Sequence, residues 1–273
     1  MRYPSAVAPP KPAMYQVIGA EIMTSRRRIP LESEPVAPHM CTVDRRLSIL
    51  RRVPFFASVA AEDIAAINGQ FHERGYAAGE TIYMAGDIAA RLYVVAVGRV
   101  KVMRHTLAGQ DVVLGVLAPG EFFGALTALG DAEYPDTAQA LTPGCVLEIA
   151  AEDFQAILRR YPSVALATLD IVAERLRDAH AQIRQLSAEP ATSRVAAALL
   201  GLAQKLGEQH EGALLIQMPL SREDLAAMTG ATVETVSRIM STLREDGIIR
   251  SGRQWVALAD TDRLAAMAGE ETG

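Results

Sequence analysis

The hydrophobic pattern changes character once along the chain. From about residue 70 to residue 150, short apolar segments such as Arg91–Val97 and Asp111–Leu117 alternate with polar positions. Glycines interrupt these segments at short intervals: Gly75, Gly79, Gly86, Gly98, Gly109, Gly115, Gly120 and Gly124. Short strands joined by glycine turns are typical of a β-sandwich or β-barrel. This stretch therefore predicts an all-β unit.

From residue 152 the apolar period becomes helical. Glu152–Arg160 predicts a short helix, and Pro162 opens a longer one over Ser163–Leu186. The long helix has apolar residues at alternating spacings of three and four: Leu169, Val172, Leu176, Ala179, Ile183 and Leu186. This spacing is a heptad seam, which either covers the core of its own domain or joins two copies of the chain. Because the helix ends near Pro190 without a local partner, we expect a homodimer.

A pair of short helices stands out near the C-terminus. It follows a helix, a turn and a strand predicted at residues 191–206, 207–212 and 213–218. Ser221 is a good N-cap for the first helix of the pair, which ends near Gly230. Thr232 caps the second helix, Val233–Glu245. Two helices joined by so tight a turn predict a helix-turn-helix.

The second helix of this motif has two distinct faces. Its apolar residues form one stripe, at Val236, Ile239, Met240 and Leu243. The opposite face carries Glu234, Ser237 and Arg238, near the helix N-terminus, where recognition helices present base-reading side chains. Glu234 and Arg238 have an alternative interpretation as an i,i+4 surface ion pair. A hairpin then follows, and its Arg250 and Arg253 are placed to meet phosphates as a wing.

Composition limits the possible functions. The chain has 273 residues, half of them hydrophobic and 22% charged, which is enough for two folded domains. Its net charge of −5 argues against a protein that coats nucleic acid, but a local DNA-reading surface is compatible with it. Residues 1–40 hold seven prolines and predict a disordered tail, or alternatively a basic DNA-contacting arm around Arg26–Arg28. Met40 is an alternative start of the native chain.

Several classes of protein lack support in the sequence. There is no P-loop, HExxH or nucleophile elbow, so we expect no enzyme. The two cysteines, Cys41 and Cys145, suggest neither a metal site nor a disulfide framework, and they suit a reducing cytoplasm. No apolar stretch is long enough to predict a membrane span.

From Leu47 to Asp260 the sequence resembles the CRP/FNR family of bacterial transcription regulators. The most specific segments are Ser221–Ala226 and Val233–Arg238. Further matching segments are Ala78-Gly79-Glu80, Val97-Gly98-Arg99-Val100 and Pro119-Gly120-Glu121-Phe122-Phe123-Gly124. The resemblance implies an α+β fold, with a cyclic-nucleotide-binding-like β-roll, a long dimerisation helix and a C-terminal winged helix-turn-helix. The expected divisions are a tail (1–40), a β-roll sensor (41–161), a dimerisation helix (162–189) and a DNA-binding domain (190–273).

The resemblance also assigns residues on the DNA side. Glu234, Ser237 and Arg238 match the reading head of FNR-type members, whose half-site resembles TTGAT. The expected backbone contacts are Ser221, Arg222, Thr232, Thr235, Arg250 and Arg253. A two-fold symmetric protein needs a palindromic site, so the expected partners are double-stranded DNA, a second copy of the chain and RNA polymerase.

The expected effector region departs from the family's known patterns. By resemblance it comprises Gly124, Ala125, Tyr134, Pro135, Ala179 and His180. Members that bind cyclic AMP carry Glu at the position of Ala125 and an Arg-Ser pair where this chain has Tyr134 and Pro135. A buried phosphate without an Arg partner is costly, so cyclic AMP is not expected.

Other signals stay open at this point. Two cysteines are too few for the four-cysteine iron–sulfur cluster of the oxygen-sensing members, so that cluster is not expected either. Haem on His180, a redox switch at Cys41 or Cys145, and a protein without an effector remain alternatives; His72, His105 and His210 are further haem candidates. The expected function is a cytoplasmic, sequence-specific DNA-binding regulator. The alternative is a ligand-binding β-roll that regulates a protein partner without specific DNA binding.

Overall fold

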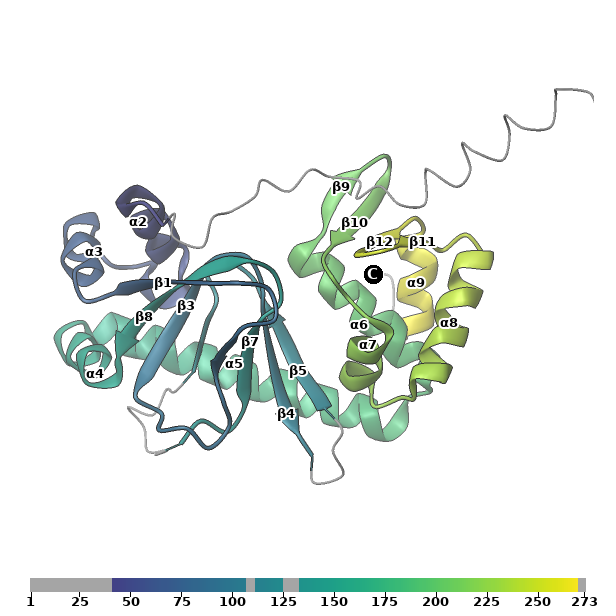
Figure 1. Ribbon diagram of the computed structural model, residues 1–273, viewed down its shortest axis with the longest axis horizontal. Helices are drawn as coiled ribbons and strands as arrows, with labels where there is room; N and C mark the ends of the chain where they lie inside the picture. The colour runs from purple at the N-terminus through teal and green to yellow at the C-terminus, as the bar shows by residue number, and fades with distance from the viewer. Residues whose placement is uncertain (1–40, 107–110, 125–132, 270–273) are drawn as a thin grey trace, which may run out of the picture.

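The computed structural model describes residues 41–106, 111–124 and 133–269. The predicted tail, its basic run at Arg26–Arg28, Met40 and Ala125 all lie outside these residues. Figure 1 shows a β-roll at one end, the long helix α5 (Pro162–Ala188) running along it, and a helical unit at the other end. The fold is α+β, as predicted.

Two four-stranded antiparallel sheets form the β-roll. Their strand orders are β1-β8-β3-β6 and β2-β7-β4-β5. The strands are β1 (His72–Tyr76), β2 (Thr81–Tyr83), β3 (Arg91–Val97), β4 (Val100–His105), β5 (Asp111–Leu117), β6 (Phe122–Gly124), β7 (Thr137–Ala140) and β8 (Gly144–Ala150). The sequence predicted β3 and β5 with these bounds. Strand β4 pairs with β5 along its whole length, from Val100 to His105.

Helices close one end of the β-roll over an apolar core. They are α2 (Val43–Arg52), the 3₁₀ turn η1 (Pro54–Phe56), α3 (Ala61–Asn68) and α4 (Ala151–Arg160). Phe55 packs edge-on against Phe56 and Phe122, with ring centroids 4.6 and 4.9 Å apart, and lies near Phe154. Edge-to-face aromatic pairs of this kind add stability beyond the area that they bury. Since η1 also packs on α5, this core connects the β-roll to the long helix.

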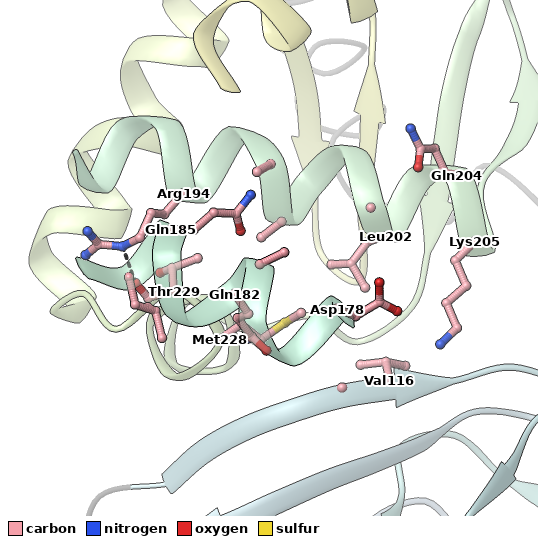
Figure 2. Close-up of a pocket in the computed structure, with 16 residues that line it drawn as sticks. Val116, Asp178, Gln182, Gln185, Arg194, Leu202, Gln204, Lys205, Met228 and Thr229 are labelled. Atoms are coloured by element: carbon pink, nitrogen blue, oxygen red, sulfur yellow. Dashed lines mark hydrogen bonds between the residues drawn. The ribbon is translucent and has the colours of Figure 1, made fainter. Parts of the chain in front are cut away.

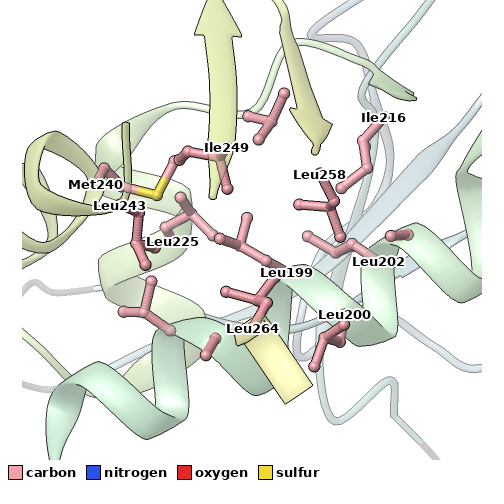
Figure 3. Packing of buried hydrophobic residues seen from close by; sticks show 14 of the residues in the cluster. Leu199, Leu200, Leu202, Ile216, Leu225, Met240, Leu243, Ile249, Leu258 and Leu264 are labelled. Atoms are coloured by element: carbon pink, nitrogen blue, oxygen red, sulfur yellow. The ribbon is translucent and has the colours of Figure 1, made fainter. Parts of the chain in front are cut away.

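A winged helix forms the C-terminal unit. Its helices are α6 (Ala191–Leu206), α7 (Arg222–Thr229), α8 (Val233–Glu245) and α9 (Thr261–Ala268). Its sheet has the order β11-β12-β10-β9, with β9 (Glu208–His210), β10 (Ala213–Gln217), β11 (Ile249–Gly252) and β12 (Trp255–Leu258). Leu199, Leu225, Met240 and Leu264 come from the four helices and meet in one core, with Ile249 from the sheet (Figure 3). No helix in the three described ranges has the length and apolarity needed to cross a membrane.

Two segments differ from the sequence-based expectation. The predicted turn at residues 207–212 is partly strand, because β9 pairs with β10 and the chain turns at Glu211-Gly212. Helix α9 was not predicted. It packs on α6 and completes the core through Leu264, which is fully buried.

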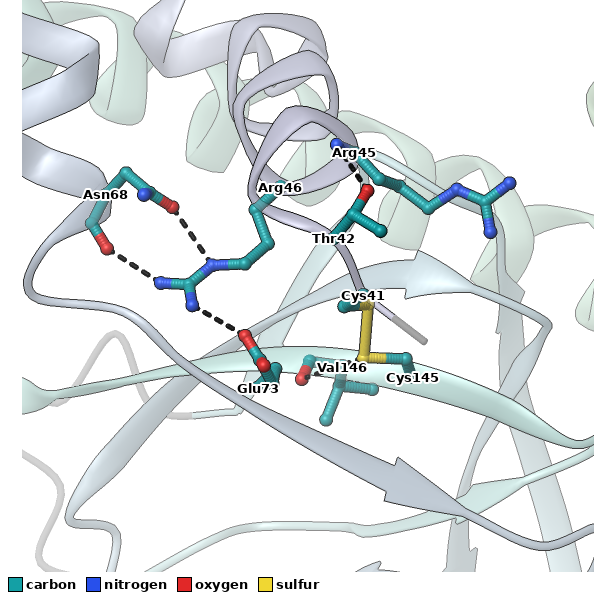
Figure 4. The surroundings of a disulfide bond; sticks show 8 residues. All are labelled: Cys41, Thr42, Arg45, Arg46, Asn68, Glu73, Cys145 and Val146. Atoms are coloured by element: carbon teal, nitrogen blue, oxygen red, sulfur yellow. Dashed lines mark hydrogen bonds and ion pairs between the residues drawn. A yellow bond between two sulfur atoms is a disulfide. The ribbon is translucent and has the colours of Figure 1, made fainter. Parts of the chain in front are cut away.

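The cysteines contradict the expectation that no disulfide forms. Cys41 and Cys145 are joined, although 104 positions separate them (Figure 4). The segment before α2 folds back over β8 and brings the two Cα atoms within 6.8 Å of each other. Arg46 anchors α2 nearby, through hydrogen bonds to Asn68 and to the carbonyl oxygen of Phe71 and an ion pair with Glu73. Sequence spacing alone carries no signal for such a long-range pairing.

Candidate nucleic-acid interface and sensory region

The helix-turn-helix begins with a complete capping box. The Ser221 hydroxyl accepts a hydrogen bond from the Asp224 backbone N–H at 2.9 Å, and the Asp224 carboxylate accepts one from the Ser221 backbone N–H at 3.1 Å. Two amide groups that would otherwise lack partners are satisfied in this way, which stabilises a helix start by about 1 kcal/mol. The helix therefore starts where the sequence predicted.

A left-handed glycine makes the turn between the two helices. Gly230 has φ +59°, a conformation that L side chains rarely adopt. A Cβ there would lie 3.1 Å from a methyl carbon of Leu186, so the end of α5 lies against this turn. The hydroxyl of Thr232 then caps α8 by accepting a hydrogen bond from the Thr235 backbone N–H. The turn thus fixes the angle at which α8 leaves α7.

The reading face, which we define as Glu234, Ser237 and Arg238, points away from the winged-helix core. Glu234 and Arg238 are exposed and Ser237 is half-buried, while the apolar stripe of α8 is buried. The alternative interpretation required an ion pair between Glu234 and Arg238, and no such pair forms between these two described residues. Both side chains remain available to an external partner.

The residues expected to contact the DNA backbone surround the reading face, but they differ in how accessible they are to a phosphate group. Ser221 and Thr232 are exposed, and the Thr232 hydroxyl donates to that of Thr235 at 3.0 Å. Burial lowers the pKa of the Arg222 guanidinium from its usual value, and the neighbouring charge of Arg244 lowers it further. Two adjacent cations near a helix N-terminus make a favourable place for an anion such as a phosphate.

The two wing arginines are not equivalent. Arg250 lies on β11, where its guanidinium is 4.0 Å from the Glu211 carboxylate and donates to the Glu211 carbonyl oxygen at 3.4 Å. Arg253 lies at the turn between β11 and β12, is exposed, and has no hydrogen bond or ion pair with any described residue. Arg253 is therefore the freer of the two cations.

The expected effector region is partly filled by aromatic rings. Tyr134 is 4% exposed and stacks on Tyr83 with ring centroids 3.9 Å apart. Its hydroxyl donates to the Arg91 carbonyl oxygen and accepts from the Arg91 backbone N–H. Gly124 has φ +84°, and a Cβ there would come within 2.8 Å of the Tyr93 ring. Tyr134 is thus held in place by packing and by hydrogen bonds to the backbone of Arg91.

The remaining expected effector residues lie on surfaces. Pro135 is exposed and, with Tyr134, Arg104 and His105, lines an open cavity of about 510 Å³. Ala179 and His180 are exposed on α5 and do not line this cavity. Nowhere in the described ranges do three or more His, Cys, Asp or Glu side chains gather as a metal site would require.

Arg175 connects α5 to the β-roll, and Asp136 forms a hydrogen bond within the β-roll; sequence analysis missed both. Asp136 accepts a hydrogen bond from the Tyr83 hydroxyl at 2.8 Å. Burial raises the pKa of Asp136, although the Tyr83 hydrogen bond and the charges of Arg104 and Arg175 act in the opposite direction. Arg175 reaches from α5 to the carbonyl oxygen of Phe122. No local motif marks either residue, because their partners are far away in sequence.

The predicted heptad seam forms an apolar face on α5. Leu169, Leu176 and Ile183 are 64%, 56% and 61% exposed, and Leu186 is 44% exposed. Val172 is half-buried and Ala179 is exposed. An isolated α5 would therefore leave a row of large apolar side chains in water, which is unfavourable unless another surface covers them.

The winged helix docks on the outer face of the β-roll. Lys101 on β4 forms an ion pair with Asp224 on α7, and Lys205 on α6 forms one with Glu121, which lies just before β6. Val116 on β5 is 3% exposed and belongs to the same buried cluster as the winged-helix core. Beside it, β5, α5, α6 and α7 enclose a cavity of about 360 Å³, in which Lys205 and Val116 lie across from each other (Figure 2).

Comparison with known proteins agrees with this division of the molecule. The family described as "Cyclic nucleotide-binding domain" matches residues 73–161, and the "Crp-like helix-turn-helix domain" matches residues 193–267. The chain is 36% identical to the "Cyclic AMP receptor protein" of Thermus thermophilus, over 79% of this chain and 96% of that protein. It is 28% identical to the "Transcriptional activator protein FnrA" of Stutzerimonas stutzeri, over 70% of this chain and 78% of that protein.

A solved structure shows the same architecture. FixK2 from Bradyrhizobium japonicum is 27% identical and superposes with a TM-score of 0.65, over 72% of this chain and 96% of that chain. The shared β-roll, long helix and winged helix, together with the sequence identity to named regulators, show that this chain belongs to the CRP/FNR family of transcription regulators.

Proposed function

We propose that the chain binds a palindromic, TTGAT-like DNA site as a homodimer, under the control of a signal sensed by the β-roll. The observation that carries this proposal is the reading face. Glu234 and Arg238 are exposed on the N-terminal half of α8, whose other face is packed in the winged-helix core. Arg bonds guanine in bidentate fashion and Glu accepts from cytosine N4, so the pair suits recognition of a G·C-containing step in the major groove.

The backbone of the DNA would be held on both sides of the reading face. Ser221, Arg222, Thr232 and Thr235 lie at the starts of α7 and α8, and the wing carries Arg250 on β11 and Arg253 in its turn. Hydroxyls, guanidinium groups and helix N-termini are the usual partners of phosphate oxygens. These contacts position the protein on DNA, and the base contacts of the reading face provide specificity.

The exposed seam of α5 supports a dimer. Leu169, Leu176 and Ile183 would pack against the same residues of a second copy, as heptad positions do. Two-fold symmetry then presents two recognition helices to two half-sites, which requires a palindrome. The division into a sensor (41–161), a dimerisation helix (162–189) and a DNA-binding domain (190–273) is part of the proposal.

We further propose that the signal is not cyclic AMP. A relative named for cyclic AMP is 36% identical, but in this chain Tyr134 fills the expected phosphate position. A neutral, stacked ring provides no countercharge for a buried phosphate. As a DNA-binding regulator the chain would act in the cytoplasm, with RNA polymerase as its protein partner.

The experiment that tests the function is a DNA-binding titration of the full chain. Fluorescence anisotropy compares a TTGAT-type palindrome with a scrambled duplex of the same length. Arg238→Ala should weaken palindrome binding by about 1–3 kcal/mol and relax base preference at one position. Arg253→Ala should weaken binding to both duplexes about equally. A wild-type chain that binds both duplexes with the same affinity would refute the proposed function.

The same titration tests which signal, if any, changes the DNA affinity of the protein. Protein purified without oxygen is examined by absorbance spectroscopy, with and without haem and nitric oxide, and is titrated with DNA in each state. A stoichiometric Soret band with haem-dependent DNA binding would identify a gas sensor and make His180→Ala the next variant. A colourless protein that binds the palindrome unaided would exclude haem. Cyclic AMP at about 1 mM should leave the DNA affinity unchanged, since Tyr134 offers no phosphate partner.

A further inference from the structure

Lys101 and Asp224 form the more enclosed of two ion pairs that the described residues make between the β-roll and the winged helix. They are 123 positions apart, and their Nζ and Oδ1 atoms lie 2.9 Å apart. Their side chains are only 16% and 15% exposed. A second ion pair, Lys205–Glu121, lies at the same junction between the β-roll and the winged helix, and its side chains are 34% and 33% exposed. Solvent screens an enclosed pair less, so Lys101 and Asp224 hold their relative position more firmly.

Asp224 uses its two carboxylate oxygens for different partners. Oδ1 accepts from Lys101, while Oδ2 accepts from the backbone N–H and the hydroxyl of Ser221. Burial by itself would raise the pKa of Asp224, but the hydrogen bonds from Ser221 and Lys101 outweigh it and hold the pKa below its usual value. The carboxylate therefore remains charged at neutral pH. One side chain thus caps α7 and also ties the cap to the β-roll.

The junction leaves the reading face free. Val116 fills the apolar part of the junction next to the ion pair. Helix α8 lies on the side of the winged helix away from the β-roll in Figure 1, and Glu234 and Arg238 are exposed. The junction therefore does not cover the reading face. What the junction determines is the direction in which the N-terminus of α7 points relative to the β-roll.

We propose that Lys101 is a positioning residue for DNA recognition. It acts through Asp224 on the start of α7, where Ser221 and Arg222 would grip phosphate, and it does not touch DNA itself. In a dimer, both recognition helices must reach successive major grooves together, so a loosely oriented winged helix weakens binding to the whole site. This inference rests on the proposed DNA-binding function.

The test measures palindrome affinity of the full chain at several salt concentrations. Lys101→Met removes the charge and keeps a side chain of similar length. We expect it to bind the palindrome roughly tenfold or more weakly, as the loss of a charged hydrogen bond does. The slope of log affinity against log salt concentration should stay at its wild-type value, because that slope counts phosphate contacts. Lys101→Arg should recover most of the affinity.

Two further variants serve as controls for the salt-dependent titration. Arg253→Ala should reduce the salt slope by about 0.9, as a lost phosphate contact does. Arg51→Met removes one exposed charge on α2, at the opposite end of the molecule, and should change neither the affinity nor the slope. Thermal unfolding of each variant by circular dichroism establishes that it is folded at the temperature of the titration.

A double-mutant cycle with Asp224→Asn tests the route of action. If Lys101 works through Asp224, the losses of palindrome affinity in the two single variants are not additive. The double variant then binds the palindrome only slightly less tightly than the single variant with the lower affinity. Wild-type affinity of folded Lys101→Met would overturn the proposal, as would full additivity or the absence of any rescue by Lys101→Arg. A reduced salt slope would show that Lys101 contacts DNA directly, and this too would overturn it.

Failure of this inference is distinguishable from failure of the proposed function. If the wild-type chain does not prefer the palindrome over the scrambled duplex, the proposed function itself fails. If the wild-type chain prefers the palindrome and Lys101→Met does so with equal affinity, only the positioning role fails.

Discussion

Arg175 on α5 places its guanidinium carbon 4.0 Å from the ring centroid of Phe122 and donates a hydrogen bond to the carbonyl oxygen of the same residue at 2.7 Å. Phe122 begins β6 and is buried in the core beneath the helices of the β-roll. One side chain of the long helix thus contacts both the ring and the backbone of a residue in a β-roll strand. The same helix carries the apolar seam, so α5 contacts β6 through Arg175 and presents the predicted dimer surface through Leu169, Leu176 and Ile183.

Removal of this connection should destabilise the protein measurably. We expect Arg175→Ala to lower the free energy of unfolding by about 1–2 kcal/mol, because both the cation–π contact and a charged hydrogen bond are lost. Urea unfolding followed by circular dichroism measures the change. Arg177→Ala is the control, since Arg177 is exposed on the same helix and has no partner among the described residues. Equal effects of the two substitutions would mean that the Phe122 contact contributes little.

The seam of α5 gives a prediction about assembly. Leu176→Asp places a charge in the middle of the exposed apolar row, where it would have to be buried in a dimer. We expect the variant to be monomeric in analytical ultracentrifugation and to lose specific DNA binding. Arg177→Asp, one position outside the seam, should remain dimeric. A dimeric Leu176→Asp variant with normal affinity would exclude this surface as the dimer interface.

The disulfide should make stability sensitive to reductant. It closes a loop across 104 positions, and disulfides typically contribute about 2–4 kcal/mol to stability. We therefore expect dithiothreitol to lower the urea midpoint of the oxidised protein. The double variant Cys41→Ser, Cys145→Ser should show no response to dithiothreitol. If oxidised and reduced wild-type proteins unfold at the same midpoint, the link does not stabilise the fold.

Asp136 gives a prediction about pH. Burial raises the pKa of Asp136 in the folded chain above the usual 3.8. At a pH between the unfolded and the folded pKa, the folded state therefore retains a proton that the unfolded chain has released. Stability from this group is therefore complete below the unfolded pKa and is lost as the pH rises through the folded pKa. Asp136→Asn retains an oxygen to accept from Tyr83 but does not titrate. We expect the stability of the variant, relative to wild type, to increase between about pH 4 and neutrality.

Urea midpoints of both proteins across this pH range provide the measurement. Other carboxylates titrate in both proteins, so the difference between the two curves isolates Asp136. A constant difference over the whole range would mean that the ionisation of Asp136 does not change on folding.

The sequence by itself determined the parts of this protein that depend on local order. Alternation and glycine turns predicted an all-β unit and the bounds of β3 and β5, and heptad spacing predicted α5 and the apolar row along it. The capping residues Ser221 and Thr232 predicted the bounds of both helices of the helix-turn-helix, because capping is a hydrogen bond between neighbours in sequence. The orientation of Glu234 and Arg238 away from the core followed from the helical period of α8.

Only the tertiary structure decided which distant residues meet. The link between Cys41 and Cys145, the stack of Tyr134 on Tyr83, the contact of Arg175 with Phe122 and the pairing of Lys101 with Asp224 all join residues far apart in the chain. No local pattern encodes such contacts, since each depends on how sheets and helices pack after they have formed. The sequence therefore specified the helix that we propose reads DNA, and packing specified how its domain is connected to the β-roll.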